Sequence, residues 1–328
     1  MSTPVLQVRG LTTRFRTDRG ELTAVDDVSF DVGRGETVAI VGESGSGKSV
    51  TALSILRLIP SPPGRIAAGE VIFENRNLLE LDNASIRDIR GNKIAMIFQE
   101  PMSSLNPSLT VGIQVAEPIN EHRRTPWTAA LEKAAELISR VRIPDAQSRL
   151  ASFPHQYSGG MRQRIMIAMS LGCAPSLIIA DEPTTALDVT VQAQILDLLK
   201  QITQESGTAL MLITHDLGVV ARYADRVIVM YGGRIVETAP ARELYKKPRH
   251  PYTVGLLTSV PRLDGDTRRR LIPIDGQPPD LARLPAGCAF APRCRAAVAR
   301  CHHERPKLEP VSPTHQKACF ANAELVVQ

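Results

Sequence analysis

The sequence predicts an α/β protein whose parallel sheet is covered by helices on both faces. Short apolar runs alternate with helical patterns along much of the chain, and this is the order that a parallel sheet with crossover helices requires. One such run, Thr37–Val41, ends in a glycine-rich turn that leads into a helical pattern. The chain has 328 residues, of which 43% are apolar and 22% charged, so it is long enough for one large globular domain or two modest ones.

The first hundred residues carry mainly β-strand signals. Val5–Val8, Val28–Val32 and Thr37–Val41 are apolar-rich runs between turns, and they predict three strands. A helix is predicted over Ser49–Ile59, because its apolar residues recur at helical spacing. The order strand, glycine-rich loop, helix therefore stands near the beginning of the chain.

Residues 101–160 have a different texture, which predicts an inserted helical subdomain. Helical stretches such as Thr128–Arg142 replace the strands there, and Arg and Glu are frequent. The alternation of strands and helices resumes at Gln163 and continues to about residue 240. The elements predicted in this part are helices over Gln163–Leu171 and Val191–Gln204, strands over Leu177–Ala180 and Leu210–Thr214, and a hairpin of Val227–Tyr231 and Arg234–Val236 around Gly232-Gly233.

Charge and hydropathy predict where in the cell the protein works, but they do not identify its partners. The formal net charge of +5 and the pI near 9.1 are mild for this length and exclude no class of partner. No run approaches the ~20 apolar residues of a membrane span, and Met1–Gly10 lacks the apolar core of a signal peptide. We therefore expect a cytoplasmic protein, which can work at a membrane only by docking onto the helices of other subunits.

The glycine-rich turn after Thr37–Val41 matches a phosphate-binding loop. Residues 42–49 read Gly-Glu-Ser-Gly-Ser-Gly-Lys-Ser, which fits the pattern G-x-x-x-x-G-K-[ST]. Glycines let backbone N–H groups approach phosphates closely, and the helix that follows presents its own unpaired N–H groups. Lys48 is expected at the β- and γ-phosphates of ATP, and the Ser49 hydroxyl at Mg²⁺. The predicted ATP-binding residues of this loop are Gly42, Ser44, Gly45, Ser46, Gly47, Lys48 and Ser49.

Polar residues follow three of the apolar strands. Asp181 and Glu182 end the strand Leu177–Ala180, at the carboxyl edge where open parallel sheets bind ligands. We expect Asp181 to hold Mg²⁺ and Glu182 to act as the general base for the attacking water. His215 follows the strand Leu210–Thr214, where it is placed to contact a γ-phosphate. Gln99 follows another apolar run, and its amide is placed to contact Mg²⁺ or the attacking water.

A second small-residue loop precedes the helix over Gln163–Leu171. Residues 157–164 read Tyr-Ser-Gly-Gly-Met-Arg-Gln-Arg and closely resemble the signature loop of ABC proteins. Like the phosphate-binding loop, it combines a small-residue turn with a helix N-terminus, which together make an anion site. The resemblance implies that Ser158, Gly159 and Gly160 grip the γ-phosphate of ATP bound to the opposite subunit.

The resemblance to ABC ATP-binding subunits covers about residues 5–240. It implies a P-loop NTPase cassette with a RecA-like core and mixed sheet, an N-terminal antiparallel β part and the helical subdomain at about 101–160. It further implies that Phe15 stacks on adenine, although a strand-core role is an alternative for this residue. The turn Ala186-Leu187-Asp188 matches another family element, and Asp188 is added to the predicted ATP site.

Two further stretches resemble the oligopeptide/dipeptide branch of that family. They are residues 99–107, which read Gln-Glu-Pro-Met-Ser-Ser-Leu-Asn-Pro, and residues 250–253, which read His-Pro-Tyr-Thr. The branch implies ATP hydrolysis that energises import of di- or oligopeptides at the cytoplasmic face of the bacterial inner membrane. Its implied partners are a paralogous ATP-binding subunit, two transmembrane permease subunits and an extracytoplasmic solute-binding protein, with no nucleic acid. Nickel or another small solute is an alternative cargo, and an ABC ATPase that acts on nucleic acid or ribosomes is an alternative class.

The segment 241–328 is expected to be a C-terminal extension of a nucleotide-binding domain at 1–240. It is rich in Pro and Arg and shows no long apolar periodicity, so we expect it to need a staple. Four soft thiolates select zinc or an iron–sulfur cluster, and the resemblance implies a 4Fe–4S cluster, with zinc as the alternative. The predicted ligands are Cys288, Cys294, Cys301 and Cys319.

Overall fold

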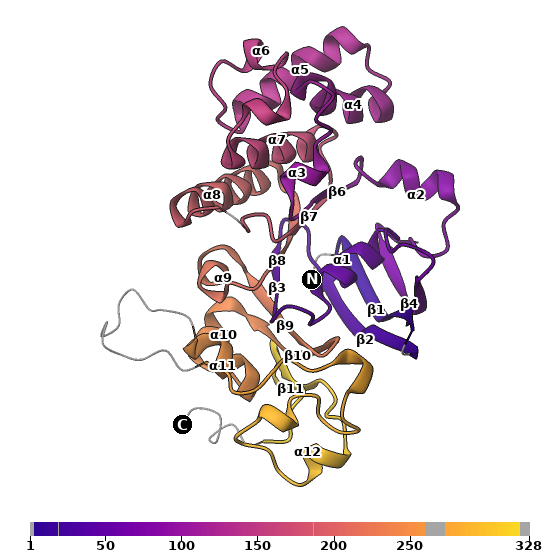
Figure 1. The fold of residues 1–328 in the computed structure, drawn as a ribbon, viewed down its shortest axis with the longest axis vertical. Coiled ribbons are helices and arrows are strands. Elements are labelled where there is room, and N and C mark those ends of the chain that lie inside the picture. The colour runs from indigo at the N-terminus through magenta and orange to yellow at the C-terminus, as the bar shows by residue number, and fades with distance from the viewer. Residues whose placement is uncertain (1–2, 19, 186, 260–272, 322–328) are drawn as a thin grey trace. The chain divides into compact units, whose positions relative to one another are not determined.

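A computed structural model describes residues 3–18, 20–185, 187–259 and 273–321, and it divides into two compact units. The first unit contains Val32–Glu36 and Glu80–Leu212, together with the first residues of the chain. The second unit contains Leu6–Asp31, Thr37–Leu79 and the chain from Ile213 onward. Figure 1 labels most of the helices and strands of both units.

The first unit is built around buried parallel strands. β6 (Ile94–Ile97) pairs with β7 (Leu177–Asp181) in parallel, with Ile94 opposite Leu177. All five residues of β7 are buried, as expected for a strand covered on both faces. β8 (Ala209–Thr214) is the next strand in the sheet order, and all six of its residues are buried too. The predicted α/β character and the two predicted strands in this region are therefore confirmed, with shifts of one residue at the ends.

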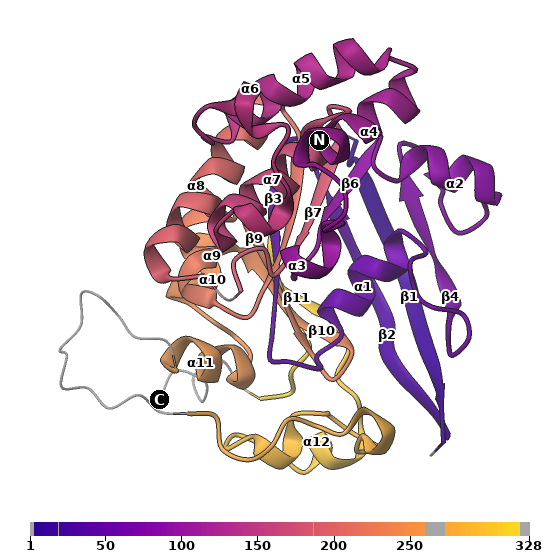
Figure 2. The same ribbon diagram turned by 45° about the horizontal axis from the view of Figure 1, so that its top comes forward.

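Helices make up most of the rest of the first unit (Figure 2). The predicted helix over Thr128–Arg142 is present as α5 (Trp127–Arg140). It ends two residues earlier than predicted, before Arg142, whose φ of 63° is left-handed. Its buried residues Ala130, Ala134, Leu137 and Ile138 lie on one face. The full set is α2 (Asn83–Ile89), α3 (Pro101–Ser104), α4 (Val111–Arg123), α5 (Trp127–Arg140), α6 (Ala146–Arg149), the 3-10 turn η1 (Pro154–Gln156), α7 (Gly159–Leu171) and α8 (Val189–Ser206).

The second unit contains a four-stranded sheet in the order β2-β1-β4-β5. β1 pairs antiparallel with β4, with Leu6 opposite Phe73, as Figures 1 and 2 both show. The first two strands are much longer than predicted, because charged residues on their exposed face hide the alternation from a search for apolar runs. The bounds are β1 (Leu6–Thr17), β2 (Gly20–Val32), β4 (Gly64–Phe73) and β5 (Arg76–Asn77).

A second group of strands in this unit carries the phosphate-binding loop. β3 (Thr37–Val41), as predicted, is buried throughout and pairs in parallel with β9 (Arg226–Tyr231). β9 and β10 (Arg234–Pro240) form the predicted hairpin, in which Gly232 and Gly233 have φ of 56° and 81° and so match the left-handed turn that joins twisted strands. The remaining elements of this unit are α1 (Lys48–Ile55), α9 (Leu217–Tyr223), α10 (Ala241–Lys246), α11 (Pro251–Thr258), η2 (Leu281–Arg283), η3 (Ala291–Arg293), α12 (Arg300–His303), β11 (Glu309–Ser312) and β12 (His315–Lys317).

The residues after 240 share an apolar core with the strands of the second unit. Leu244, Tyr252 and Phe290 pack in one buried cluster with Val229 and Tyr231 of β9. The ring centroid of Tyr231 lies 4.5 Å from that of Tyr252 and 5.2 Å from that of Phe290. Both distances are within the range of favourable aromatic pairs. The segment that was expected to need a staple is thus anchored by a core that it shares with the sheet, and the sequence pattern did not show this core because its aromatic residues are far apart in the chain.

A buried histidine joins the last strand to the same sheet. His315 on β12 has a fully buried side chain, with Nε2 2.7 Å from Glu237 Oε1 on β10 and Nδ1 3.1 Å from Glu243 Oε1 on α10. Burial lowers the pKa of His315, but the hydrogen bonds and charges of the two carboxylates outweigh it, so the pKa lies above its ordinary value. The folded protein therefore favours the charged imidazolium.

We expect this contact to stabilise the protein more at mildly acidic than at alkaline pH. Because the folded pKa is raised, its contribution is complete below the unfolded value of about 6.5 and is lost as pH rises through the folded value. The melting temperature of His315→Gln should fall below that of the parent chain at pH 6, by roughly 2–4 °C for each kcal/mol lost. The gap should narrow at pH 9. A gap that is equal at the two pH values would contradict the ion pair.

Across the part of the chain that the structure describes, no helix is both long and apolar enough to cross a membrane.

Candidate nucleotide-binding site

The backbone of the loop over residues 42–47 packs closely against neighbouring backbone and depends on glycine at two positions. It leaves the buried strand β3 at Val41 and enters α1 at Lys48, with Gly47 as the N-cap in a left-handed conformation (φ 101°). A Cβ on Gly42 would lie 2.3 Å from the Met230 carbonyl oxygen, and one on Gly47 would lie 2.6 Å from the Ala24 carbonyl oxygen. Both positions therefore require glycine, since any side chain would clash with backbone.

Lys48 places its ammonium group inside this loop. Its Nζ donates to the carbonyl oxygens of Gly42 (2.8 Å) and Glu43 (2.9 Å) and lies 3.4 Å from Ser46 Oγ. The residue is only 4% exposed. Ser44 and Gly45 are exposed at the loop's tip, and Ser49 is half-buried. A fixed cation beside a helix N-terminus and a cradle of small residues fits the phosphates of a nucleotide.

Two other predicted residues also lie in the second unit. Phe15 is a half-buried residue of β1 opposite Gly64, and its ring would lie 2.8 Å from a Cβ on that glycine. His215 is exposed and follows β8 directly. The turn after it is fixed by a hydrogen bond from Asp216 N to Thr214 Oγ1 of 3.0 Å.

In the first unit the structure brings together Gln99, Asp181 and Glu182 at one strand edge. Asp181 is the last residue of β7 and is 6% exposed. Glu182 follows with φ of 45°, a left-handed conformation that costs a non-glycine residue on the order of 1–3 kcal/mol. Its Oε2 accepts hydrogen bonds from Gln99 Nε2 (3.1 Å) and Thr185 Oγ1 (2.9 Å). Gln99, which the sequence places 83 residues earlier, thus orients the proposed base.

The predicted signature residues open helix α7 in the first unit. Ser158 is the N-cap, and its Oγ accepts from Met161 N at 3.4 Å. Gly159 and Gly160 are the first helical residues. A Cβ on Gly160 would lie 2.7 Å from Val191 Cγ1, so the glycine permits close contact between α7 and α8. The exposed Ser158 and Gly159 leave this helix N-terminus open to a ligand.

Asp188 has a local structural role in addition to its predicted place in the ATP site. It is the N-cap of α8, and its Oδ1 accepts from Val191 N at 3.0 Å. Such a cap satisfies a helix donor and typically contributes about 1 kcal/mol. Ala186, the first residue of the turn predicted around Asp188, lies outside the described residues.

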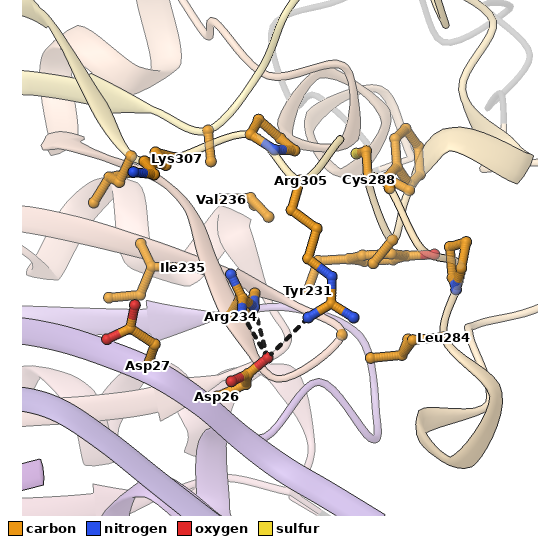
Figure 3. Close-up of a pocket in the computed structure, with 18 of the residues that line it drawn as sticks. Asp26, Asp27, Tyr231, Arg234, Ile235, Val236, Leu284, Cys288, Arg305 and Lys307 are labelled. Atoms are coloured by element: carbon orange, nitrogen blue, oxygen red, sulfur yellow. Dashed lines mark hydrogen bonds and ion pairs between the residues drawn. The ribbon is translucent and has the colours of Figure 1, made fainter. Parts of the chain in front are cut away.

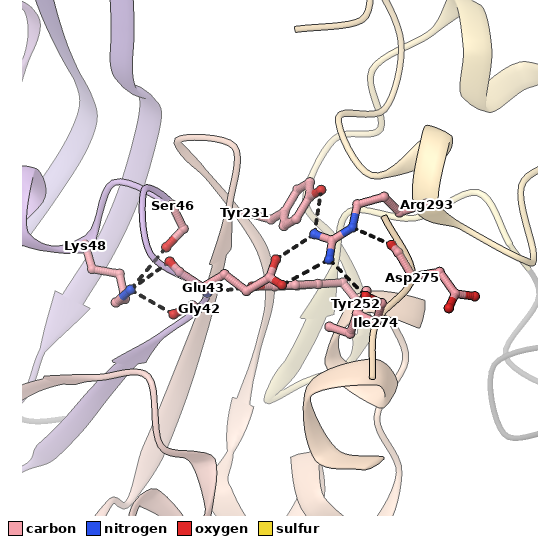
Figure 4. A network of polar contacts seen from close by, with 9 residues as sticks. All are labelled: Gly42, Glu43, Ser46, Lys48, Tyr231, Tyr252, Ile274, Asp275 and Arg293. Atoms are coloured by element: carbon pink, nitrogen blue, oxygen red, sulfur yellow. Dashed lines mark hydrogen bonds and ion pairs between the residues drawn. The ribbon is translucent and has the colours of Figure 1, made fainter. Parts of the chain in front are cut away.

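Sequence reasoning gave no role in the nucleotide site to Glu43 of the phosphate-binding loop, or to Tyr252 and Arg293, which contact Glu43. Glu43 belongs to the loop itself but has no assigned place in the phosphate motif. Figure 4 shows its carboxylate facing Arg293 of the C-terminal segment, and Tyr252 Oη accepts from its backbone N–H. The only sequence signal for these contacts is the His-Pro-Tyr-Thr stretch, in which Tyr252 stands. Nothing local marks Arg293.

A cavity of about 610 Å³ lies elsewhere in the second unit (Figure 3). Its lining includes Asp26 and Tyr231 from the strands and Cys288 from the C-terminal segment. Asp26 Oδ2 lies 2.7 Å from Arg234 Nη2 and 3.4 Å from Arg305 Nη1 at its wall. No residue of the phosphate-binding loop lines this cavity, so it is separate from the nucleotide site.

The four cysteines of the C-terminal segment do not form a metal centre, so the predicted iron–sulfur cluster is wrong, and its zinc alternative is not supported. Among the residues that the structure describes, no group of three or more His, Cys, Asp or Glu side chains is placed to hold a metal ion. Cys288 and Cys294 pack against the apolar core, and Cys301 is buried. Burial raises the pKa of Cys294 to about 11 and also raises the pKa of Cys288 and Cys319. In each case burial disfavours the charged thiolate, so the environment favours the neutral thiol.

Family comparisons agree with the sequence motifs. Residues 25–185 match the ABC transporter family, and residues 236–301 match the family described as "Oligopeptide/dipeptide transporter, C-terminal region". The chain is 53% identical over 332 residues to a putative peptide import ATP-binding protein of Brucella melitensis, covering 98% of each chain. It is 50% identical to the dipeptide transport ATP-binding protein DppD of Bacillus subtilis, covering 96% of this chain and 94% of DppD.

The oligopeptide transport ATP-binding protein OppD of Bacillus subtilis is similarly close, with 50% identity over 95% of this chain and 87% of OppD. Among solved structures, the ATP-binding cassette MJ0796 is similar in a dimeric post-hydrolysis state with ADP and Pi bound. It has a TM-score of 0.65 and 29% identity, and the match covers 72% of this chain and 99% of the cassette. This likeness confirms the predicted cassette fold with its mixed sheet and helical parts.

Proposed function

Because this chain belongs to the ABC transporter family of ATP-binding subunits, in its oligopeptide/dipeptide branch, we propose that it binds and hydrolyses ATP to energise import of di- or oligopeptides. The observation that carries the cargo class is similarity along nearly the whole chain to peptide import ATP-binding proteins. The C-terminal match over residues 236–301 supports the same branch. A nickel importer or an ATPase acting on nucleic acid has no comparable support.

The phosphate-binding loop supplies the binding half of the proposed activity. Lys48 and the loop residues Gly42, Ser44, Gly45, Ser46 and Gly47 receive the phosphates of ATP, and Phe15 stacks on the adenine. Ser49, Gln99 and Asp181 are the proposed ligands of Mg²⁺. When bound, this ion neutralises charge that develops on the phosphates. The close-packed glycines and the buried ammonium support this role for the loop.

The strand edge in the first unit supplies the chemical half. Glu182 takes a proton from the attacking water as general base. Gln99 and Thr185 fix the orientation of the Glu182 carboxylate through hydrogen bonds of 3.1 Å and 2.9 Å. His215 contacts the γ-phosphate. The constrained backbone of Glu182 supports a catalytic position, because such conformations concentrate at functional sites.

The complete site is proposed to form between two ATP-binding subunits. Ser158, Gly159 and Gly160 of one subunit contact the γ-phosphate held by the loop of the other, with Asp188 near the same junction. These contacts exist only in the closed pair, so ATP shifts the population toward closure and hydrolysis reverses the shift. The open, exposed N-terminus of α7 supports this arrangement.

Family membership implies membrane permease subunits as partners. The finer assembly is part of the proposal: a paralogous ATP-binding subunit, two permease subunits and an extracytoplasmic peptide-binding protein, with this chain at the cytoplasmic face of the inner membrane. Residues 1–240 are proposed to form the nucleotide-binding domain, and residues 241–328 an extension of it.

The test is transport by the reconstituted complex. The chain is assembled with its permease and ATP-binding partners in proteoliposomes, and uptake of a labelled dipeptide or oligopeptide is measured with ATP supplied on the side of this subunit. ATP-dependent peptide uptake is expected, with no uptake when ADP replaces ATP. ATP hydrolysis that is stimulated by nickel but not by any peptide would overturn the proposed cargo and keep the ATPase.

Ser158→Arg should separate binding from turnover. Arginine at this exposed helix N-terminus blocks the proposed contact with the partner's ATP, while the chain's own phosphate-binding loop is untouched. We expect unchanged ATP affinity of the isolated subunit and a loss of at least about 100-fold in ATPase rate of the complex, as for loss of a transition-state donor. Loss of ATP binding in the isolated variant would contradict a role toward the opposite subunit.

A further inference from the structure

We propose that Arg293, in the C-terminal segment, is a positioning residue of the nucleotide site, which holds and neutralises Glu43 of the phosphate-binding loop. The inference rests on the proposed ATP-binding role of that loop. It extends this role to a residue far along the chain that no motif marks.

Arg293 and Glu43 form a two-pronged ion pair (Figure 4). Arg293 Nη1 lies 2.7 Å from Glu43 Oε2, and Nη2 lies 3.0 Å from Glu43 Oε1. The side chains are only 6% and 24% exposed, respectively. A paired fork of this kind fixes both distance and orientation, which a lysine cannot do. Its burial separates it from surface ion pairs, which contribute little.

The guanidinium is itself held in place on several sides. Arg293 Nε donates to the Asp275 carbonyl oxygen at 2.8 Å, and Nη2 lies 3.4 Å from the Ile274 carbonyl oxygen. Nη1 lies 3.3 Å from Tyr231 Oη on β9. The hydrogen bond with Glu43 raises the pKa of Arg293, so the residue stays a cation. The guanidinium of Arg293 is therefore fixed in position, unlike that of a mobile surface arginine.

Glu43 is fixed through its backbone as well as its side chain. Its N–H donates to Tyr252 Oη at 2.7 Å, and its carbonyl oxygen is one of the two that accept from Lys48 Nζ; the other belongs to Gly42. A shift of Glu43 would therefore move two of the groups that place the ammonium of Lys48. Arg293 is thus connected to the phosphate-binding cation through one intervening residue.

The charge of Glu43 explains why the loop needs this partner. A carboxylate in a loop that binds a nucleoside triphosphate repels the negatively charged ligand. The repulsion is strong at the reduced effective dielectric constant of a partly buried site. Arg293 cancels that charge. Without Arg293, Glu43 would stand uncompensated beside the phosphates.

The main experiment measures affinity of the full-length subunit for MgATP by calorimetry. Arg293→Gln should raise the Kd roughly 5- to 20-fold, where tenfold corresponds to about 1.4 kcal/mol. The loss should be smaller for ADP, which carries less charge. Arg300→Gln is the matched control: it removes the same charge from a side chain of the C-terminal segment that is 59% exposed and paired with Glu304, and its Kd for MgATP should not change.

A double variant distinguishes the effect of an uncompensated charge on Glu43 from a general packing role of Arg293. Glu43→Gln combined with Arg293→Gln removes both charges, so its MgATP affinity should recover to within about threefold of the parent value. Arg293→Lys, which keeps the charge but not the fork, should give an intermediate Kd. In the assembled complex, Arg293→Gln should raise KM for ATP much more than it lowers kcat.

Two results would overturn the inference. One is an unchanged Kd for both nucleotides in a folded Arg293→Gln chain. The other is a double variant that binds as weakly as Arg293→Gln alone, which would indicate disrupted packing. Failure of the proposed function looks different, because the parent chain itself would then not bind MgATP.

Discussion

Glu182→Gln should retain ATP binding and nearly abolish ATP turnover in the assembled transporter, by about 10²–10⁴-fold in kcat. The amide is the same size as the carboxylate and keeps an oxygen that can accept from Gln99 and Thr185, which bond Glu182 at 3.1 Å and 2.9 Å. The replacement therefore preserves the geometry and removes only the proposed proton acceptor. Because the proposed phosphate site is the loop at residues 42–49, ATP affinity should change by less than about threefold.

The measurement is steady-state ATPase activity of the complex together with MgATP affinity of the isolated subunit. Glu205→Gln provides the matched control. Glu205 lies near the end of α8, and its exposed carboxylate pairs with Arg140. That variant should have parental activity. Turnover of Glu182→Gln within threefold of the parent would remove Glu182 from the role of general base.

Lys48→Ala should have the largest effect on binding, with an increase in the Kd for MgATP of at least about 100-fold. Lys48 is the loop's own cation, and charge-assisted hydrogen bonds of this kind contribute about 1.5–3 kcal/mol each. Its Nζ also ties Gly42 and Glu43 together at 2.8 Å and 2.9 Å. The variant therefore loses both the phosphate contact and part of the loop's order.

Calorimetry on the full-length subunit measures this affinity, and circular dichroism checks that the variant is folded. Lys133→Ala serves as the control, because Lys133 is an exposed residue of α5 paired with Glu136. It should bind MgATP as the parent does. A folded Lys48→Ala chain with parental affinity would show that the loop is not the site of phosphate binding.

Strands that are buried on both faces were well predicted from local pattern. β3 has the predicted bounds, and β7 differs from its prediction by one residue, because a strand buried on both faces is a continuous apolar run. α1 was predicted to continue to Ile59 but ends at Ile55, before Arg57 adopts φ of 53°. The apolar spacing persists past that point, so periodicity alone did not show where the helix stops.

The sequence by itself determined the nucleotide chemistry of this protein. A phosphate-binding loop needs glycines, a lysine and a hydroxyl at fixed spacing, because neighbouring backbone groups make the cradle, and so the motif is legible in residues 42–49. The same holds for the acidic end of β7, where adjacent residues in the chain are adjacent at the strand edge. These assignments depend on short-range geometry.

Only the tertiary structure showed how the C-terminal segment packs and which residues it contacts. Its cysteines suggested a metal staple, but Tyr252 and Phe290 bury themselves against β9 and supply the core that the sequence pattern did not show. The ion pair between Glu43 and Arg293 joins residues 250 positions apart, and no local pattern encodes such a pairing. Burial and charge compensation depend on which surfaces meet when the chain folds, and that is a property of the whole second unit and not of any one stretch of it.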